Sequence, residues 1–207
     1  TSSHQVAPWR LNIIPWGNVI IDLNFDIFWG EYTGKRISIK EFLADTVDIE
    51  MYGVKVKTLP LLKTMVQVVL HHYKEMNSIY HLVRHKCIDI NKFKDIYYLL
   101  KNNMEEISLD SLYAISTEYE IIPYVYYMLY WTKQIFSDTD IELYVDAFKC
   151  EDGIKLLENY GLAENEQKTW RVDFFTRLES DNIFELIKDD LTTADFEKIA
   201  RNRRIFS

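Results

Sequence analysis

The chain has 207 residues, of which 48% are hydrophobic and 27% charged, and its formal net charge is −8. This balance is typical of a globular protein with one large domain or two small ones. The six glycines and four prolines form neither G-x-G-x-x-G nor G-x-x-x-x-G-K-[ST], which excludes a Rossmann-type dinucleotide site and a P-loop.

The two cysteines, Cys87 and Cys150, form no C-x-x-C motif and predict reduced thiols in a cytoplasmic protein. No apolar run approaches the roughly 20 residues that span a bilayer, and no signal-peptide pattern opens the chain. We therefore expect a cytoplasmic protein with no membrane partner. The chain begins at Thr1 and not at Met, which suggests a fragment or a trimmed chain.

Charge is distributed unevenly along the chain. Residues 106–207 carry 11 basic and 21 acidic side chains, a net charge of −10, so we expect no duplex nucleic acid as a partner. Residues 61–105 carry 7 basic and 4 acidic side chains, a net charge of +3, and four of the five histidines. A phosphate-bearing ligand is expected to meet this middle part; a solvated surface is the alternative.

The first 58 residues are predicted to be rich in β-structure. Strands are expected at 10–14 and 18–29, separated by a Pro-Trp-Gly break, because apolar and polar residues alternate from 18 to 29. A short helix is expected at 37–45, and a hairpin about Gly53 is expected to join 47–52 to 54–58.

The pattern becomes helical after Thr58, where apolar residues from Leu61 onward follow helix spacing. Pro60 suits the first turn of this helix, and Ser137–Asp140 and Thr192–Asp195 resemble capping boxes. Further helices are expected at 78–86, 91–103, 109–119, 122–136, 139–149, 152–160, 170–179, 182–190 and 194–204. The predicted fold class is α+β, with a small mixed or antiparallel sheet in a β-rich part (1–58) followed by a mainly α-helical bundle (59–207).

The polar face of the strand at 18–29 is the first candidate site. Asp22 and Asn24 are neighbours on one face of a strand, about 7 Å apart, so both can serve one site. Carboxylate and amide oxygens are the ligands that Mg²⁺ prefers. The alternative is that this face is simply exposed to water.

Histidines form a second candidate group. His81 and His85 are four residues apart on a predicted helix, but the sequence His-Leu-Val-Arg-His lacks the glutamate of a metalloprotease H-E-x-x-H motif. A zinc hydrolase is therefore disfavoured, and His71 or His72 is interpreted as a polar helix residue near a cleft.

The tyrosines between residues 119 and 131 are interpreted as helix packing, because only Lys133 lies near enough to support a nucleic-acid platform.

Four stretches follow one another in the first part of the chain: Val19–Phe25, Val54–Leu62, Val69–Tyr73 and Asn91–Leu100. Taken in this order, they resemble the uncharacterised nucleotidyltransferases of the DNA polymerase β-like superfamily. In that family a strand with a metal-binding carboxylate precedes a second strand, a helix with a histidine, and a helix with an aspartate. The resemblance covers about residues 1–120.

The resemblance implies an Mg²⁺-dependent transfer of a nucleotidyl group from an NTP to an unknown acceptor. It gives Asp22 the role of a catalytic metal ligand and makes Asn24, His72 and Asp95 candidate ligand-binding residues, with His71 as an alternative to His72. Asn24 stands where the family has histidine. The Gly-Ser turn and the D-x-D strand that open the family's catalytic unit are absent, so two of its three carboxylates are missing from this chain.

Two functions therefore remain open at this point. One is a nucleotidyltransferase, possessing here only part of its catalytic carboxylates. The other is a non-catalytic helical module, derived from such an enzyme, that binds a partner through the tyrosine-rich region 113–131.

Overall fold

The computed structural model describes residues 9–13, 17–21, 26–30, 32–84 and 87–206, with side chains described between residues 26 and 202. Asp22 and Asn24, the two residues predicted on the strand face, lie outside this part of the chain. The described residues form an α+β arrangement with eleven α-helices and three separate two-stranded antiparallel sheets. The predicted α+β class is therefore confirmed at this level.

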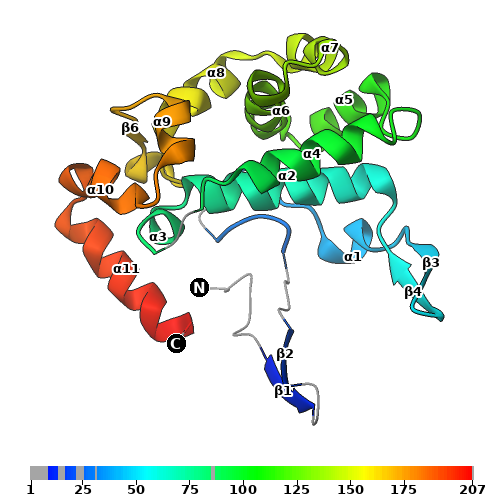
Figure 1. Cartoon of the computed structure of the whole chain (residues 1–207), viewed down its shortest axis with the longest axis horizontal. Helices are drawn as coiled ribbons and strands as arrows, with labels where there is room; N and C mark the ends of the chain where they lie inside the picture. Colours follow the sequence, from blue (N-terminus) through cyan, green and yellow to red (C-terminus); the bar gives the residue numbers. More distant parts are fainter. Residues whose placement is uncertain (1–8, 14–16, 22–25, 31, 85–86, 207) are drawn as a thin grey trace.

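Two hairpins, with one short helix between them, precede the first long helix (Figure 1). The first pairs β1 (Trp9–Ile13) with β2 (Gly17–Ile21), and the second pairs β3 (Val47–Met51) with β4 (Val54–Thr58). The second hairpin turns through Tyr52 and Gly53, whose φ angles of 52° and 76° are both positive, as a type I′ turn requires. The hairpin predicted about Gly53 is thus confirmed.

The strand predicted at 18–29 is wrong at its C-terminal end. Phe28 and Trp29 are neighbours in sequence and both are buried, which a strand with one buried face does not permit. The Asp26 carboxylate accepts a hydrogen bond from the Phe28 amide (3.0 Å) and pairs with Arg36. Arg36 also donates to the carbonyl oxygen of Trp29 at 3.1 Å, so local polar contacts hold the chain in a turn.

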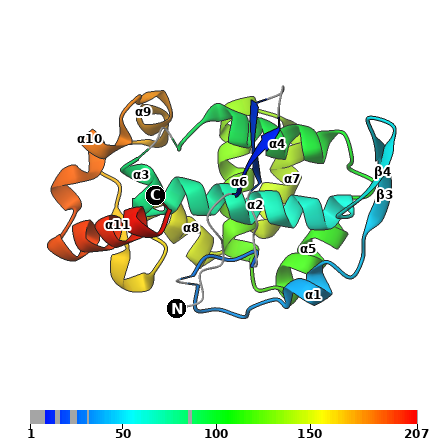
Figure 2. The same cartoon turned by 90° about the horizontal axis from the view of Figure 1, so that it is seen from below.

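The longest helix described, α2 (Leu61–Asn77), crosses the middle of the molecule. It begins directly after Pro60, which occupies the N-cap, one position before the predicted first turn. Its buried face contacts α4 (Ile90–Lys101) and α6 (Ile122–Phe136). Figure 2 shows α2 running between the β3–β4 hairpin at one end and α11 (Thr193–Phe206) at the other.

Most of the remaining helices lie within a few residues of their predicted positions. The largest departures are at α3 (Ile79–Leu82), which ends four residues earlier than predicted, and at α9 (Phe174–Glu179), which begins four residues later. The others are α1 (Ile39–Phe42), α5 (Leu109–Glu118), α7 (Thr139–Phe148), α8 (Glu151–Glu158) and α10 (Ile183–Ile187), with 3-10 turns η1 (Glu164–Glu166) and η2 (Lys188–Asp190).

A short hairpin that the sequence did not predict separates α8 from α9. It pairs β5 (Asn159–Tyr160) with β6 (Lys168–Thr169). Gly161 has a φ of 102° after β5, and the rings of Tyr160 and Trp170 pack with centroids 4.4 Å apart. The predicted helices at 152–160 and 170–179 therefore end early and begin late, respectively.

One of the two predicted capping boxes is present. The Thr192 amide donates to the Asp195 carboxylate at 2.7 Å, and the Asp195 amide donates back to the Thr192 hydroxyl at 3.3 Å. The other prediction is wrong by one residue. Ser137 instead ends α6 in a left-handed conformation, and Asp138 caps α7 by accepting from the Asp140 amide at 2.8 Å.

The buried core is built around the three helices α2, α4 and α6. Each contributes apolar side chains that are at most 1% exposed, among them Val69 and Leu70 of α2, Phe93 and Ile96 of α4, and Val125 and Met128 of α6. Among the described residues, no helix combines the length and the apolar character needed to cross a membrane.

Candidate functional site

Helices α2 and α4 bring together two residues that the resemblance singled out. His72 of α2 and Asp95 of α4 are 23 positions apart in sequence, and His72 Nε2 lies 3.0 Å from Asp95 Oδ2. On α4, Phe93 and Ile96 fill the core on either side of Asp95, which leaves its carboxylate at the surface. The buried faces of the two helices thus fix where this polar pair forms.

Three further side chains join this pair. Glu75, one turn after His71 on α2, approaches His71 Nε2 with its Oε1 atom at 3.3 Å. Its other oxygen, Oε2, accepts from Lys92 of α4. The five residues His71, His72, Glu75, Lys92 and Asp95 are called the α2–α4 polar cluster below.

Burial and neighbouring charges set the protonation of the cluster. Burial lowers the pKa of His72 from its ordinary 6.5, the charge of Lys92 lowers it further, and the hydrogen bond with Asp95 acts in the opposite direction. Burial alone raises the pKa of Glu75, but its hydrogen bonds with His71 and Lys92 outweigh this, so the pKa lies below its ordinary 4.5. At neutral pH the cluster therefore contains a neutral His72 beside an ionised Glu75.

The neutral His72 ring has one nitrogen that is not used. A carboxylate only accepts hydrogen bonds, so the contact with Asp95 places the ring proton on Nε2. Nδ1 then carries a lone pair, and this buried atom has no hydrogen-bond partner within the described part of the chain. One nitrogen holds the ring in place, and the other is a free hydrogen-bond acceptor that could also bind a metal ion.

A small cavity of about 110 Å³ adjoins the cluster at His71. It lies between α1, α2 and the turn that contains Asp26. Its polar wall is formed by Asp26, Gln67, His71 and Lys74, of which Lys74 is only 8% exposed. The remaining wall is apolar, from residues that include Phe28 and Phe42. The volume suits a few water molecules or one small polar group, and it is too small to enclose a nucleotide.

The donor atoms in this region do not suit Mg²⁺, the ion that the resemblance implies. Among the described residues, one group has the spacing of metal ligands: one ligand atom from each of His71, His72 and Glu75 lies within 4.8 Å of the others. Two of its three donors are imidazole nitrogens, whereas Mg²⁺ prefers six oxygens. Asp22, the predicted ligand, lies outside the described residues.

The prediction that His81 and His85 lie on the same face of one helix is wrong. Helix α3 ends at Leu82, so the premise of an i, i+4 face is not met, and His85 lies outside the described residues. The tyrosine-rich region also behaves as packing. Tyr126 and Tyr127 are 3% and 0% exposed, which confirms the packing interpretation for these two and removes them as a binding surface.

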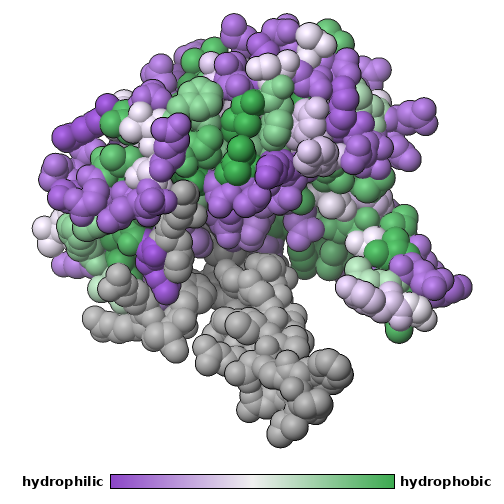
Figure 3. All heavy atoms as spheres, in the orientation of Figure 1, coloured by the Kyte–Doolittle hydropathy of each residue, from purple (hydrophilic) through white to green (hydrophobic). Residues whose placement is uncertain are grey.

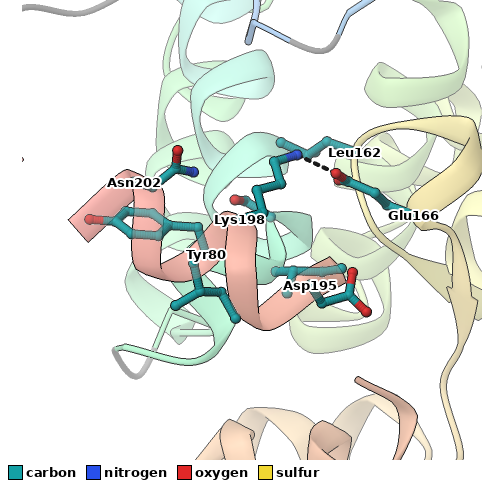
Figure 4. A pocket seen from close by; sticks show the side chains of 9 residues that line it. Tyr80, Leu162, Glu166, Asp195, Lys198 and Asn202 are labelled. Carbon is teal, nitrogen blue, oxygen red and sulfur yellow. Dashed lines mark hydrogen bonds and ion pairs between the residues drawn. The ribbon is translucent and has the colours of Figure 1, made fainter. Parts of the chain in front are cut away.

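A second cavity lies between α3, η1 and α11 and is shown in Figure 4. Its volume of about 20 Å³ admits about one water molecule. Lys198 pairs with Glu166 across it, and Lys168 Nζ lies 2.9 Å from the Asp195 carboxylate. These paired charges hold α11 against the β5–β6 hairpin, so we assign this cavity a structural role.

An open apolar groove of about 550 Å³ lies between α3, α10 and α11. Val83, Phe184, Phe196 and Ile199 line it, together with Ala200, and none of them supplies a polar atom from its side chain. The groove therefore offers no group for acid–base, nucleophilic or metal chemistry.

Sequence reasoning had pointed to His72 and Asp95 but missed Glu75. Its spacing from His71, four residues on one helix, was the available signal. It also missed Lys74 as part of a cavity wall, because a lysine on the apolar side of a helix has no distinctive pattern in sequence.

Comparisons of the chain with protein-family models, curated proteins and solved structures found no match.

Proposed function

We propose that this protein is a nucleotidyltransferase-like protein that binds an NTP and transfers its nucleotidyl group to an acceptor. The observation that supports this is the meeting of His72 and Asp95 at 3.0 Å. The resemblance selected both residues from separate stretches of sequence, and a shared site requires that they lie together. Under this proposal the two hairpins are the remnant of a nucleotidyltransferase sheet.

The described residues suggest what each part of the cluster does for such a ligand. Lys92, whose side chain is 15% exposed, is placed to attract a phosphate that approaches the face shared by α2 and α4. Neutral His72 donates from Nε2 and is oriented by Asp95. Because the cavity beside His71 is too small for a base or sugar, the ligand lies across the cluster with its larger part at the surface.

In the reaction, an oxygen of the acceptor attacks the α-phosphorus of the NTP, the bond to the bridging oxygen breaks, and pyrophosphate leaves. The fixed cluster contributes by positioning the phosphates and neutralising their charge. Mg²⁺, as the resemblance implies it, would be held by Asp22 and would supply further charge neutralisation.

Nucleotide binding is tested by thermal unfolding with each of the four NTPs and MgCl₂. At about 100 times the Kd, a bound ligand stabilises by about 2.7 kcal/mol, which raises the Tm of a chain of this size by about 5–10 °C. We expect His72→Ala, Lys92→Met and Asp22→Asn to reduce the shift. Lys149→Met, which removes an exposed lysine at the C-terminal end of α7, is the matched control and should retain the shift.

The absence of a shift with all four NTPs in the unmodified protein would contradict the proposal. So would a shift that Lys92→Met and Lys149→Met reduce equally, because that result describes general charge attraction and no defined site.

A second candidate function, a non-catalytic binding module, is favoured by the β3–β4 hairpin. One face of this hairpin presents Val47, Ile49, Met51 and Val54, which are 38–60% exposed (Figure 3). A contiguous exposed apolar face is a common feature of surfaces that contact other molecules. If this is the function, Mg²⁺ and NTP produce no thermal shift and Asp22→Asn has no consequence.

A further inference from the structure

We propose that the α2–α4 polar cluster binds one divalent transition-metal ion of the zinc type through His71, His72 and Glu75. This site is distinct from the Mg²⁺ site that the resemblance implies, and the proposal does not depend on nucleotide binding. It starts from the approach of one ligand atom from each of the three residues to within 4.8 Å of the others.

The distances in the cluster are close to those that a metal ion imposes. Ligand bonds of about 2.0–2.1 Å in a tetrahedral zinc site separate neighbouring donor atoms by about 3.3 Å. His71 Nε2 and Glu75 Oε1 are already 3.3 Å apart. His72 needs to approach by about 1.5 Å or less, a change that side-chain rotation can supply.

The donor set favours zinc-type ions over Mg²⁺. Two imidazoles and one carboxylate form the His₂Glu set of catalytic zinc sites, which leaves a fourth position for water or for a ligand. Of the three ligands, His71 also lines the cavity of about 110 Å³, so that cavity adjoins the site on the His71 side. Both histidines are on α2, whose buried face fixes the ligands on a rigid helix.

The surroundings of His72 provide a second, independent observation. A histidine that ligates a metal usually donates its other ring N–H to a carboxylate, which orients the ring. Asp95 forms this contact with His72 Nε2 at 3.0 Å, and Nδ1 is the buried nitrogen without a hydrogen-bond partner among the described residues. The carboxylate is therefore in place, and Nδ1 is the ring nitrogen that remains available to a metal ion.

Lys92 gives the proposal a sharp test. It donates to Glu75 Oε2, so Glu75 can offer Oε1 to a metal ion while it keeps this contact. The ammonium group nevertheless repels a cation close by. We expect Lys92→Met to strengthen metal binding, whereas the same variant should weaken the binding of an NTP. This one variant should therefore raise the affinity for the metal ion and lower the affinity for the NTP.

The experiment uses the full chain with metal alone and no nucleotide. Zn²⁺ is titrated by calorimetry against a competing chelator, and Co²⁺ is titrated while its visible absorption is recorded as a report of tetrahedral coordination. We expect one equivalent to bind. His71→Ala and Glu75→Gln should each weaken Zn²⁺ by at least about tenfold, the loss that follows from changing even an outer partner of a metal ligand.

Asp95→Asn tests the orienting carboxylate and should weaken Zn²⁺ by about tenfold to a hundredfold while leaving one binding equivalent. His71→Ala is the preferred ligand variant because the His71 side chain is 46% exposed, so the fold tolerates its loss. The matched controls are His81→Gln on α3 and Glu158→Gln at the end of α8, and both should bind Zn²⁺ as the unmodified protein does.

Three results would overturn the proposal. They are no stoichiometric Zn²⁺ binding, binding that His71→Ala and Glu75→Gln leave intact, and binding that His81→Gln removes to the same degree. A failure here with a normal NTP shift rejects the metal site alone. Zn²⁺ binding without any NTP shift rejects the nucleotide function alone.

Discussion

Arg177 is a buried cation without an ion-pair partner among the described residues. It is 2% exposed, and its guanidinium carbon lies 4.5 Å from the centre of the Trp170 ring, with the rings of Phe174 and Trp131 at 5.3 and 5.7 Å. Its Nε donates to the Asp173 carbonyl oxygen at 3.3 Å. Burial lowers the pKa of its guanidinium, the charge of Asp173 acts in the opposite direction, and the aromatic faces add cation–π contacts.

We expect the shape of Arg177 to matter more than its charge. Arg177→Ala leaves a cavity between aromatic rings and should lower the free energy of unfolding by about 2–5 kcal/mol. Arg177→Met retains most of the apolar stem and should cost less than about 1.5 kcal/mol. Urea unfolding measures both. Equal losses in the two variants would show that the cation itself is required.

The two cysteines should differ in reactivity. Burial raises the pKa of Cys87 to about 12, so its thiol stays protonated and unreactive at pH 8. Cys150 is half-buried, and its Sγ accepts from the Gly153 amide at 3.3 Å at the start of α8. We expect a thiol reagent at pH 8 to modify one cysteine in the folded protein and two in denaturant. Cys150→Ser should abolish the native reaction; modification of Cys87 would contradict this account.

At the scale of the element, the turn of the β3–β4 hairpin contains a strained residue. Tyr52 has a φ of 52° and a side chain that is 98% exposed, so it holds a left-handed conformation without a packing contact in return. Asn adopts this conformation more readily, and Asn-Gly is a preferred type I′ pair. Tyr52→Asn should raise the free energy of unfolding by about 0.5–1 kcal/mol in a urea titration. Tyr52→Val should lower the free energy of unfolding, because a β-branched residue suits positive φ less well than tyrosine does.

Helix α11 depends on an ionised cap. Burial raises the pKa of Asp195, but hydrogen bonds from the Thr192 amide and from Lys168 outweigh this and lower it below its ordinary 3.8. Because the folded-state pKa is depressed, the ionised carboxylate stabilises the fold above about pH 3.8 and loses this effect as the pH falls through the folded-state value.

Asp195→Asn should therefore reduce stability at pH 7, by about 0.5–2 kcal/mol as for the loss of a helix cap. The difference between the variant and the unmodified protein should shrink as the pH falls below about 3.8, as thermal unfolding across pH would record. A difference that stays constant with pH would mean that packing, and not charge, explains the effect.

At the scale of the whole molecule, helices and hairpins were more predictable from the sequence than the tertiary contacts between them. The hairpin about Gly53 and helix α6 were predictable because turn chemistry and apolar spacing are local signals. The β5–β6 hairpin was not, because strands of two residues are too short to show alternation. Residues 26–30 depart from strand geometry because Arg36 binds Asp26 and several carbonyl groups, and no local pattern records such contacts.

The candidate site was predictable only in part for the same reason. His72 and Asp95 were named through the resemblance, and the structure places them together. Glu75 and Lys92 join them because α2 packs against α4 at one particular rotation, which depends on the side chains of the whole core. The role of Asp22 as a metal ligand remains a prediction, since Asp22 lies outside the described residues.

The central place of α2 has a consequence for hydrogen exchange. Its buried face from Met65 to Met76 packs against α4 and α6, so the hydrogen-bonded amides of this helix should exchange with solvent mainly when the whole molecule unfolds. The β3–β4 hairpin, which has an exposed apolar face, should exchange through local opening and much sooner. A mass-spectrometric time course that found α2 as labile as the hairpin would contradict this order.

A ligand at His71 and His72 would therefore bind the slowest-exchanging helix. Its binding energy would slow the exchange of the α2 amides by the factor by which it stabilises the entire fold. The protection of one helix would thus serve as a measure of occupancy at a site on its surface.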